Sequence, residues 1–127
     1  MNLQNLFATI ENYRRRQAAL NILAALVDCR DLSPLPTPYN QLMDDLISMR
    51  GGHKSNYAEA IKLLEADGFV ERVVEIDGEY EPAAPYRTGP RYYKEGTGHL
   101  DHKVALSTSP AVLAAFGRPP LDFRMRK

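Results

Sequence analysis

The chain has 127 residues, of which 44% are hydrophobic and 25% are charged, and its 16 basic residues balance its 16 acidic residues. This length and composition suit one globular domain with its own core, and they exclude both a disordered chain and two ordinary domains. Because the net charge is zero, contact with nucleic acid would have to depend on local clusters of basic side chains.

The N-terminal residues have the spacing of an amphipathic helix, with Leu3, Leu6, Phe7 and Ile10 at i, i+3, i+4 and i+7. The helical pattern continues into residues 18–29, which are apolar on almost every side. We therefore expect either one long helix or two in series, with the second at the centre of the core. The N-terminal stripe needs a partner surface, which is either its own domain or a second copy of the chain.

We expect a cytoplasmic protein. The basic residues within positions 1–16 follow the apolar ones, which is not the order of a signal peptide. The apolar run that follows is too short to span a bilayer and contains Asn21 and Asp28. The single cysteine, Cys29, excludes an internal disulfide and fits a reducing compartment.

A proline-rich segment at 30–40 ends that helix, and a second helix is expected directly after it. Thr37 is a good N-cap, and Pro38 suits the first helical position. The apolar stripe of this helix consists of Tyr39, Leu42, Met43 and Leu46, and paired glycines end it at 51–52.

A third helix is expected from about residue 55, capped by Ser55 or Asn56. Its buried face contains Tyr57, Ala60, Ile61 and Leu64. Gly68 stands where a left-handed residue commonly ends a helix, and Phe69 can fold back onto the last turn.

The remaining chain favours strands. Residues 70–76 are rich in β-formers and precede Asp77-Gly78, a strong two-residue hairpin signal. The proline-containing segment 79–90 is expected to be an edge strand or a loop. Two further strands are expected, at 91–94 and 103–107. Ser109 and Pro110 then start a short helix that Gly117 closes, which makes 1–117 one domain and 118–127 a basic tail.

The segment 63–71, "LLEADGFVE", resembles the end of the recognition helix in winged helix-turn-helix regulators of the MarR and PadR groups. The resemblance covers about residues 14–80 and implies an α+β winged-helix fold, with a helical core, an extended β-wing and a short C-terminal helix. This sequence departs from the pattern in two places. The turn between the second and third helices, at 48–55, is long for a helix-turn-helix, and the wing region is longer than one hairpin.

In this architecture the third helix enters the major groove of double-stranded DNA, and the wing contacts the DNA backbone. The residues that the resemblance implies as DNA-binding lie at the start of the third helix and in the wing: Arg50, His53, Lys54, Ser55, Asn56, Lys62, Arg87, Arg91 and Lys94. Arg14, Arg15 and Arg16 form a basic run that could touch a flanking phosphate. Glu59, on the exposed side of the same helix, would repel phosphate.

These residues predict a small homodimeric transcription regulator that binds specific DNA sequences, with Leu3, Leu6, Phe7 and Ile10 as its dimerisation residues. The alternative is a winged-helix module that binds other proteins and no nucleic acid, which zero net charge and Glu59 favour.

No enzyme, cofactor or metal site is expected. His99 and His102 are the strongest metal candidates, but their spacing in a strand or loop does not place both imidazoles on one face. The glycines in "EGTGH" lack the other residues of a phosphate-binding or dinucleotide-binding motif. No serine or cysteine has a positioned base in the pattern.

Overall fold

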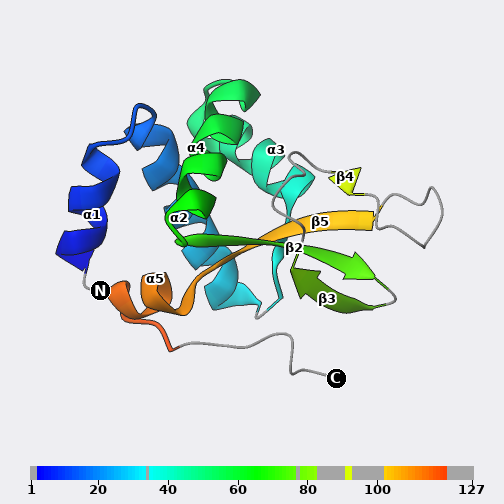
Figure 1. Ribbon diagram of the computed structural model, residues 1–127. Coiled ribbons are helices and arrows are strands. Elements are labelled where there is room, and N and C mark those ends of the chain that lie inside the picture. The colour runs from blue at the N-terminus through cyan, green and yellow to red at the C-terminus, as the bar shows by residue number, and fades with distance from the viewer. Residues whose placement is uncertain (1–2, 34, 77, 83–90, 93–101, 120–127) are drawn as a thin grey trace.

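The computed structural model describes residues 3–33, 35–76, 78–82, 91–92 and 102–119, and the following description concerns these residues. They form an α+β fold in which the helices pack against one part of an antiparallel sheet (Figure 1). The helices are α1 (Leu3–Glu11), α2 (Arg16–Leu32), α3 (Tyr39–Arg50), α4 (Lys54–Ala66) and α5 (Pro110–Ala115). The strands are β1 (Thr37–Pro38), β2 (Val70–Ile76), β3 (Glu79–Pro82), β4 (Arg91–Tyr92) and β5 (His102–Thr108).

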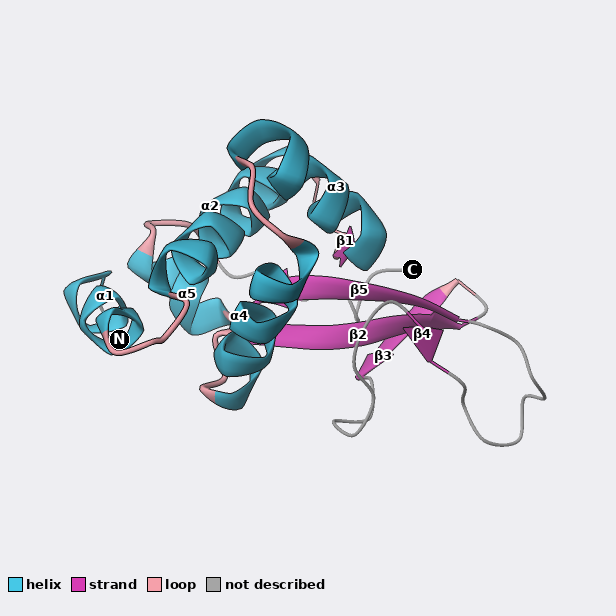
Figure 2. Ribbon diagram, turned by 90° about the horizontal axis from the view of Figure 1, so that it is seen from above, coloured by secondary structure: helices cyan, strands magenta, loops and turns pink. Residues whose placement is uncertain are grey.

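The order of the strands in the sheet is β1-β5-β2-β3, and β4 also pairs with β5. The longest pairing joins β2 to β5, from Val70 opposite Thr108 to Glu75 opposite Lys103. On the other side of β5, β1 pairs with residues 105–106 and β4 with residues 102–103. The two longest strands therefore form the centre of the sheet and extend away from the helices (Figure 2).

The core lies between the helices and one face of the sheet. Since side chains alternate between the faces of a strand, Val70, Val104 and Leu106 face the helices. Val73 and Ala105 belong to a separate small cluster with Tyr80. The fully buried helical residues include Leu6 and Ile10 of α1, Ile22 and Leu23 of α2, Leu42 and Leu46 of α3, and Ile61 and Leu64 of α4.

The first part of the chain forms two helices in series, and the second one is central to the core as expected. The predicted hairpin is also present: Ile76 is opposite Glu79, and Gly78 has a φ of +81°. The proline-containing segment after it contributes β3, an edge strand. Ser109 caps α5 as predicted, because its Oγ accepts a hydrogen bond from the Val112 amide at 3.3 Å.

Two predicted helix starts are wrong. Thr37 and Pro38 form β1, so α3 begins at Tyr39, because their backbones pair with Leu106 and Ala105 of β5. Neither Ser55 nor Asn56 caps the next helix: α4 begins at Lys54 after an extended His53, and no side-chain cap bond is present. For α3, the tertiary pairing of β1 with β5 determines where the helix begins.

The first residue of the predicted tail contacts the end of α2. Arg118, assigned to the tail, donates hydrogen bonds to the Asp31 carboxylate, with Nη2–Oδ2 at 2.9 Å. This contact joins the end of α5 to the end of α2 and holds the pKa of Asp31 below its usual value. Residues 120–127 lie outside the described residues. Among the helices described, none is both long and apolar enough to cross a membrane.

Candidate nucleic-acid interface

Helix α4 buries one face and presents the other to solvent. Tyr57, Ala60, Ile61 and Leu64 are at most 3% exposed. On the opposite side, Ser55, Glu59, Lys62 and Ala66 recur at the spacing of one helix face, and none of them is buried. This exposed face therefore carries a hydroxyl, a carboxylate, an ammonium group and a methyl group.

The turn before α4 is held close to the helix by Tyr57. The Tyr57 hydroxyl donates a hydrogen bond to the Gly51 carbonyl oxygen at 2.6 Å. Gly51 and Gly52 have φ values of +75° and +101°, a conformation that side chains disfavour. A Cβ atom on Gly52 would also lie 3.4 Å from the Tyr57 ring. The two glycines therefore let this turn fold tightly over the first turn of α4.

The predicted binding residues around this turn are accessible. Arg50, His53, Lys54, Ser55 and Lys62 are exposed, and Asn56 is half-exposed. Lys54 and Ser55 also line one side of a shallow groove of about 300 Å³ between α3 and α4, opposite Tyr39 and Met43. The structure thus gathers six of the nine predicted DNA-binding residues around the start and the exposed face of α4.

The wing residues are placed less completely. Arg91 begins β4 and its backbone pairs with Lys103 of β5. Arg87 and Lys94 lie outside the described residues. The predicted contribution of the wing to DNA contact therefore remains a prediction.

The opposite end of α4 is fixed by several contacts. The Gly68 amide donates to the Glu65 carbonyl at 3.0 Å, and the Phe69 amide donates to the Leu64 carbonyl at 2.9 Å. These two bonds form a Schellman motif around Gly68, whose φ is +76°. Phe69 is 4% exposed, so the residue that follows the turn enters the core as predicted.

A buried arginine joins this end of α4 to the sheet. The Arg72 side chain is 4% exposed, and its Nη2 lies 2.5 Å from Glu65 Oε1. Its guanidinium also lies 5.3 Å from the centre of the Tyr39 ring, on α3. This contact was not predicted from the sequence, although Val70, Arg72 and Val74 alternate in the pattern of one strand face.

The segment between α1 and α2 lies against α4. The hydroxyl of Tyr13 donates to Asp67 Oδ2 and lies 3.3 Å from the Leu63 carbonyl oxygen. Burial of the ring, together with the Asp67 carboxylate, raises the pKa of Tyr13 above its ordinary value. The neighbouring Arg15 donates from Nε to Glu59 Oε2 at 3.3 Å. The basic run that includes exposed Arg14 and Arg16 is thereby placed beside α4.

Of the four predicted dimerisation residues, two are buried and two are exposed. Leu6 and Ile10 are 0% and 1% exposed because they pack inside their own domain, so they offer no surface to a second copy. Leu3 and Phe7 are exposed, and the Phe7 ring packs edge-on against Phe116 beyond α5, with 6.4 Å between centroids. α1 and α5, the first and last helices, lie side by side (Figure 1).

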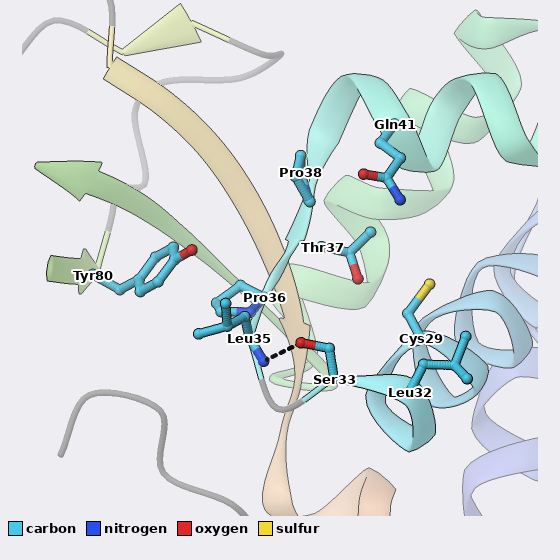
Figure 3. Close-up of a pocket in the computed structure, with 9 residues that line it drawn as sticks. All are labelled: Cys29, Leu32, Ser33, Leu35, Pro36, Thr37, Pro38, Gln41 and Tyr80. Atoms are coloured by element: carbon cyan, nitrogen blue, oxygen red, sulfur yellow. Dashed lines mark hydrogen bonds between the residues drawn. The ribbon is translucent and has the colours of Figure 1, made fainter. Parts of the chain in front are cut away.

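A second surface lies at the C-terminal end of α2. A pocket of about 310 Å³ is lined mainly by the segment from Cys29 to Pro38, with Gln41 and Tyr80 (Figure 3). Leu32 and Leu35 on this surface are 90% and 48% exposed. Within the part of the chain that the structure describes, no group of three or more histidine, cysteine or acidic residues is suitably placed for a metal. His99, one of the two histidines considered above, lies outside the described residues.

Comparison with protein-family models, with curated proteins and with solved structures gave no match to this chain.

Proposed function

We propose that the chain is a winged-helix protein that binds double-stranded DNA as a homodimer, with α4 in the major groove. The observation that carries this proposal is the exposure of basic and hydrogen-bonding side chains around the first turns of α4, on a helix whose other face is buried. Exposed polar groups on a rigid helix are what base recognition in the major groove requires.

The order of elements supports the winged-helix assignment. α2, β1, α3 and α4 are followed by β2 and β5. The sheet order β1-β5-β2 means that a short strand from between the helices lies beside the long antiparallel pair of β2 and β5. β3 and β4 are then additions to that pair of strands. The protruding end of β2 and β5 is the proposed wing (Figure 2).

Local charge supports DNA as the partner despite the neutral total. Around α4 the chain presents Arg50, His53 and Lys54 before or at its first turn, Lys62 on its exposed face, and the basic run 14–16 beside it. The Glu59 carboxylate on this surface is paired with Arg15. Phosphate neutralisation by such groups releases counterions, so DNA affinity should decrease steeply with added salt.

The test is a fluorescence-anisotropy titration of mixed-sequence duplex at several salt concentrations. The proposal predicts binding at micromolar protein or below that weakens as salt increases. Absence of salt-sensitive binding at these concentrations would overturn it. A pool of random duplexes selected with the same protein should then yield a palindromic motif, with half-sites about one duplex turn apart.

The proposed dimer uses the exposed part of α1 together with α5. Leu3 and Phe7 present apolar surface there, and Phe116 extends it. Phe7→Glu should convert a dimer to a monomer in sedimentation equilibrium, since it places a charge in the interface. Met49→Glu, a charge at an apolar side chain that is 80% exposed near the end of α3, is the matched control. A wild-type monomer at tens of micromolar protein would overturn the dimer.

The protein-interaction module remains a second candidate, and the exposed Leu32 and Leu35 beside the pocket in Figure 3 favour it. A chain of this second kind would bind no duplex in the titration above. Its interaction would be lost on substitution of Leu32 and would be insensitive to Lys54→Ala.

A further inference from the structure

We propose that Glu59 recognises cytosine in the major groove and that Arg15 positions its carboxylate; this inference rests on the DNA binding proposed above. Glu59 lies on the solvent side of α4, one turn after Ser55 and close to one turn before Lys62. Its side chain is 42% exposed, so the carboxylate is accessible to a ligand placed against this face.

The pairing with Arg15 contributes little to stability. Arg15 Nε and Glu59 Oε2 are 3.3 Å apart, and the two side chains are 36% and 42% exposed. Ion pairs this exposed are weak contributors to folding because water screens them and both side chains lose freedom. In the structure, the pair orients the Glu59 carboxylate toward Arg15.

The position of Arg15 depends on contacts of its segment with α4 and not only on its ion pair with Glu59. Tyr13, two residues earlier, is 8% exposed and contacts both Leu63 and Asp67 at the far end of α4. Arg15 itself directly precedes α2, which packs on α4. The guanidinium is thus supplied from a segment that is attached to α4 at a second point.

This arrangement removes the electrostatic objection to a carboxylate at a DNA surface. An isolated Glu59 would be repelled by phosphates, whereas the Arg15–Glu59 pair carries no net charge. Only Nε of the guanidinium bonds to Glu59, so the remaining N–H donors of Arg15 can reach a phosphate. The carboxylate can accept a further hydrogen bond. Cytosine N4 and adenine N6 both offer donors in the major groove, but adenine also presents the N7 acceptor, which a carboxylate cannot satisfy, so cytosine is the base that suits Glu59.

The test uses the motif selected by the wild-type protein and three variants, Glu59→Gln, Arg15→Met and Asp28→Asn. Asp28 is exposed on α2, and its substitution changes the net charge as Glu59→Gln does. Competition anisotropy with duplexes that differ at one C·G pair measures the preference for cytosine. We expect Glu59→Gln to reduce that preference by about tenfold, and adenine to be accepted in its place, since glutamine pairs with adenine N6 and N7.

Arg15→Met should lower the affinity for all duplexes and also reduce the cytosine preference, while Asp28→Asn should leave the preference unchanged. If Glu59→Gln raises the affinity for every duplex equally, Glu59 is only a repulsive charge and the inference is overturned. The same holds if the selected motif has no position that depends on Glu59. If the wild-type protein binds no duplex, the proposed DNA binding itself is overturned. That result differs from a wild type that binds DNA while Glu59→Gln leaves the cytosine preference unchanged.

Discussion

The two ends of α4 differ in how they are held. The end from Leu63 to Phe69, called here the anchored end, is fixed by a Schellman motif, by Tyr13 and by the Glu65–Arg72 ion pair. The end from Gly51 to Asn56, called here the free end, has exposed side chains, no side-chain cap, and one hydroxyl contact from Tyr57. One helix therefore combines a structural end with an end whose polar groups are available.

This difference separates stability from the proposed function. Substitutions at the anchored end should destabilise the fold, whereas truncation of exposed polar side chains at the free end should change DNA affinity at nearly constant stability. The following variants test that separation, in order of decreasing expected change in stability.

Leu64→Ala should destabilise the protein by about 3 kcal/mol, because Leu64 is fully buried and its truncation leaves a cavity under α4. Urea denaturation measures the change. Leu32→Ala is the same substitution at a side chain that is 90% exposed, and it should change stability by less than about 0.5 kcal/mol. Equal losses in the two variants would contradict the assignment of the core.

Arg72→Met should destabilise by about 2 kcal/mol, since it leaves the partly buried Glu65 carboxylate without its arginine. The double variant Arg72→Met with Glu65→Gln should recover part of this loss, because the unpaired charge is then absent. Thermal denaturation of the wild type and both variants gives the comparison. A double variant less stable than Arg72→Met would show that the ion pair is not the cause.

Gly51→Ala and Gly68→Ala form a matched pair, one at each end of α4. The two φ values are +75° and +76°, and a Cβ atom at either position meets no atom within 4 Å. Each substitution should therefore cost about 1 kcal/mol from backbone strain alone. We expect only Gly51→Ala to weaken DNA binding in the anisotropy titration, since it disturbs the turn that carries His53. Equal losses of DNA affinity in the two variants would contradict a specific role of the free end in DNA binding.

Tyr13→Phe should have the smallest effect on stability at neutral pH, about 0.5 kcal/mol for the loss of one partly exposed hydrogen bond. Its effect appears in alkali. The folded protein raises the pKa of Tyr13 above the ordinary 10.0, so the stability from the protonated phenol is complete below pH 10 and is lost as pH increases toward the raised pKa.

Stability measured from pH 8 to pH 11 should therefore decline less in Tyr13→Phe than in the wild type. Some decline remains in the variant, because burial also raises the pKa of Tyr39 and Tyr80. Identical declines in stability with pH in the two proteins would contradict a raised pKa of Tyr13 in the folded state. Tyr57→Phe, the corresponding deletion at the free end, should instead lower DNA affinity because it releases the Gly51 carbonyl.

The anchored end of α4 is the part of the site that the sequence predicts most completely. Leu64, Gly68 and Phe69 each have a local signal, namely apolar spacing, a left-handed turn residue and a following apolar residue, and the structure confirms all three. The helix starts were less readable, since the pairing of Thr37 and Pro38 with β5 depends on residues almost 70 positions later. The Arg15–Glu59 contact spans 44 positions and has no local signal at all.

The proposed function requires that the free end of α4 and its exposed face contact DNA. It is tested most directly by the salt dependence of duplex affinity in the wild type and in Lys54→Ala/Lys62→Ala. If both side chains contact phosphates, the slope of log affinity against log salt should decrease in magnitude by about 2, at unchanged stability. A slope identical to that of the wild type, with equal affinity, would contradict the claim.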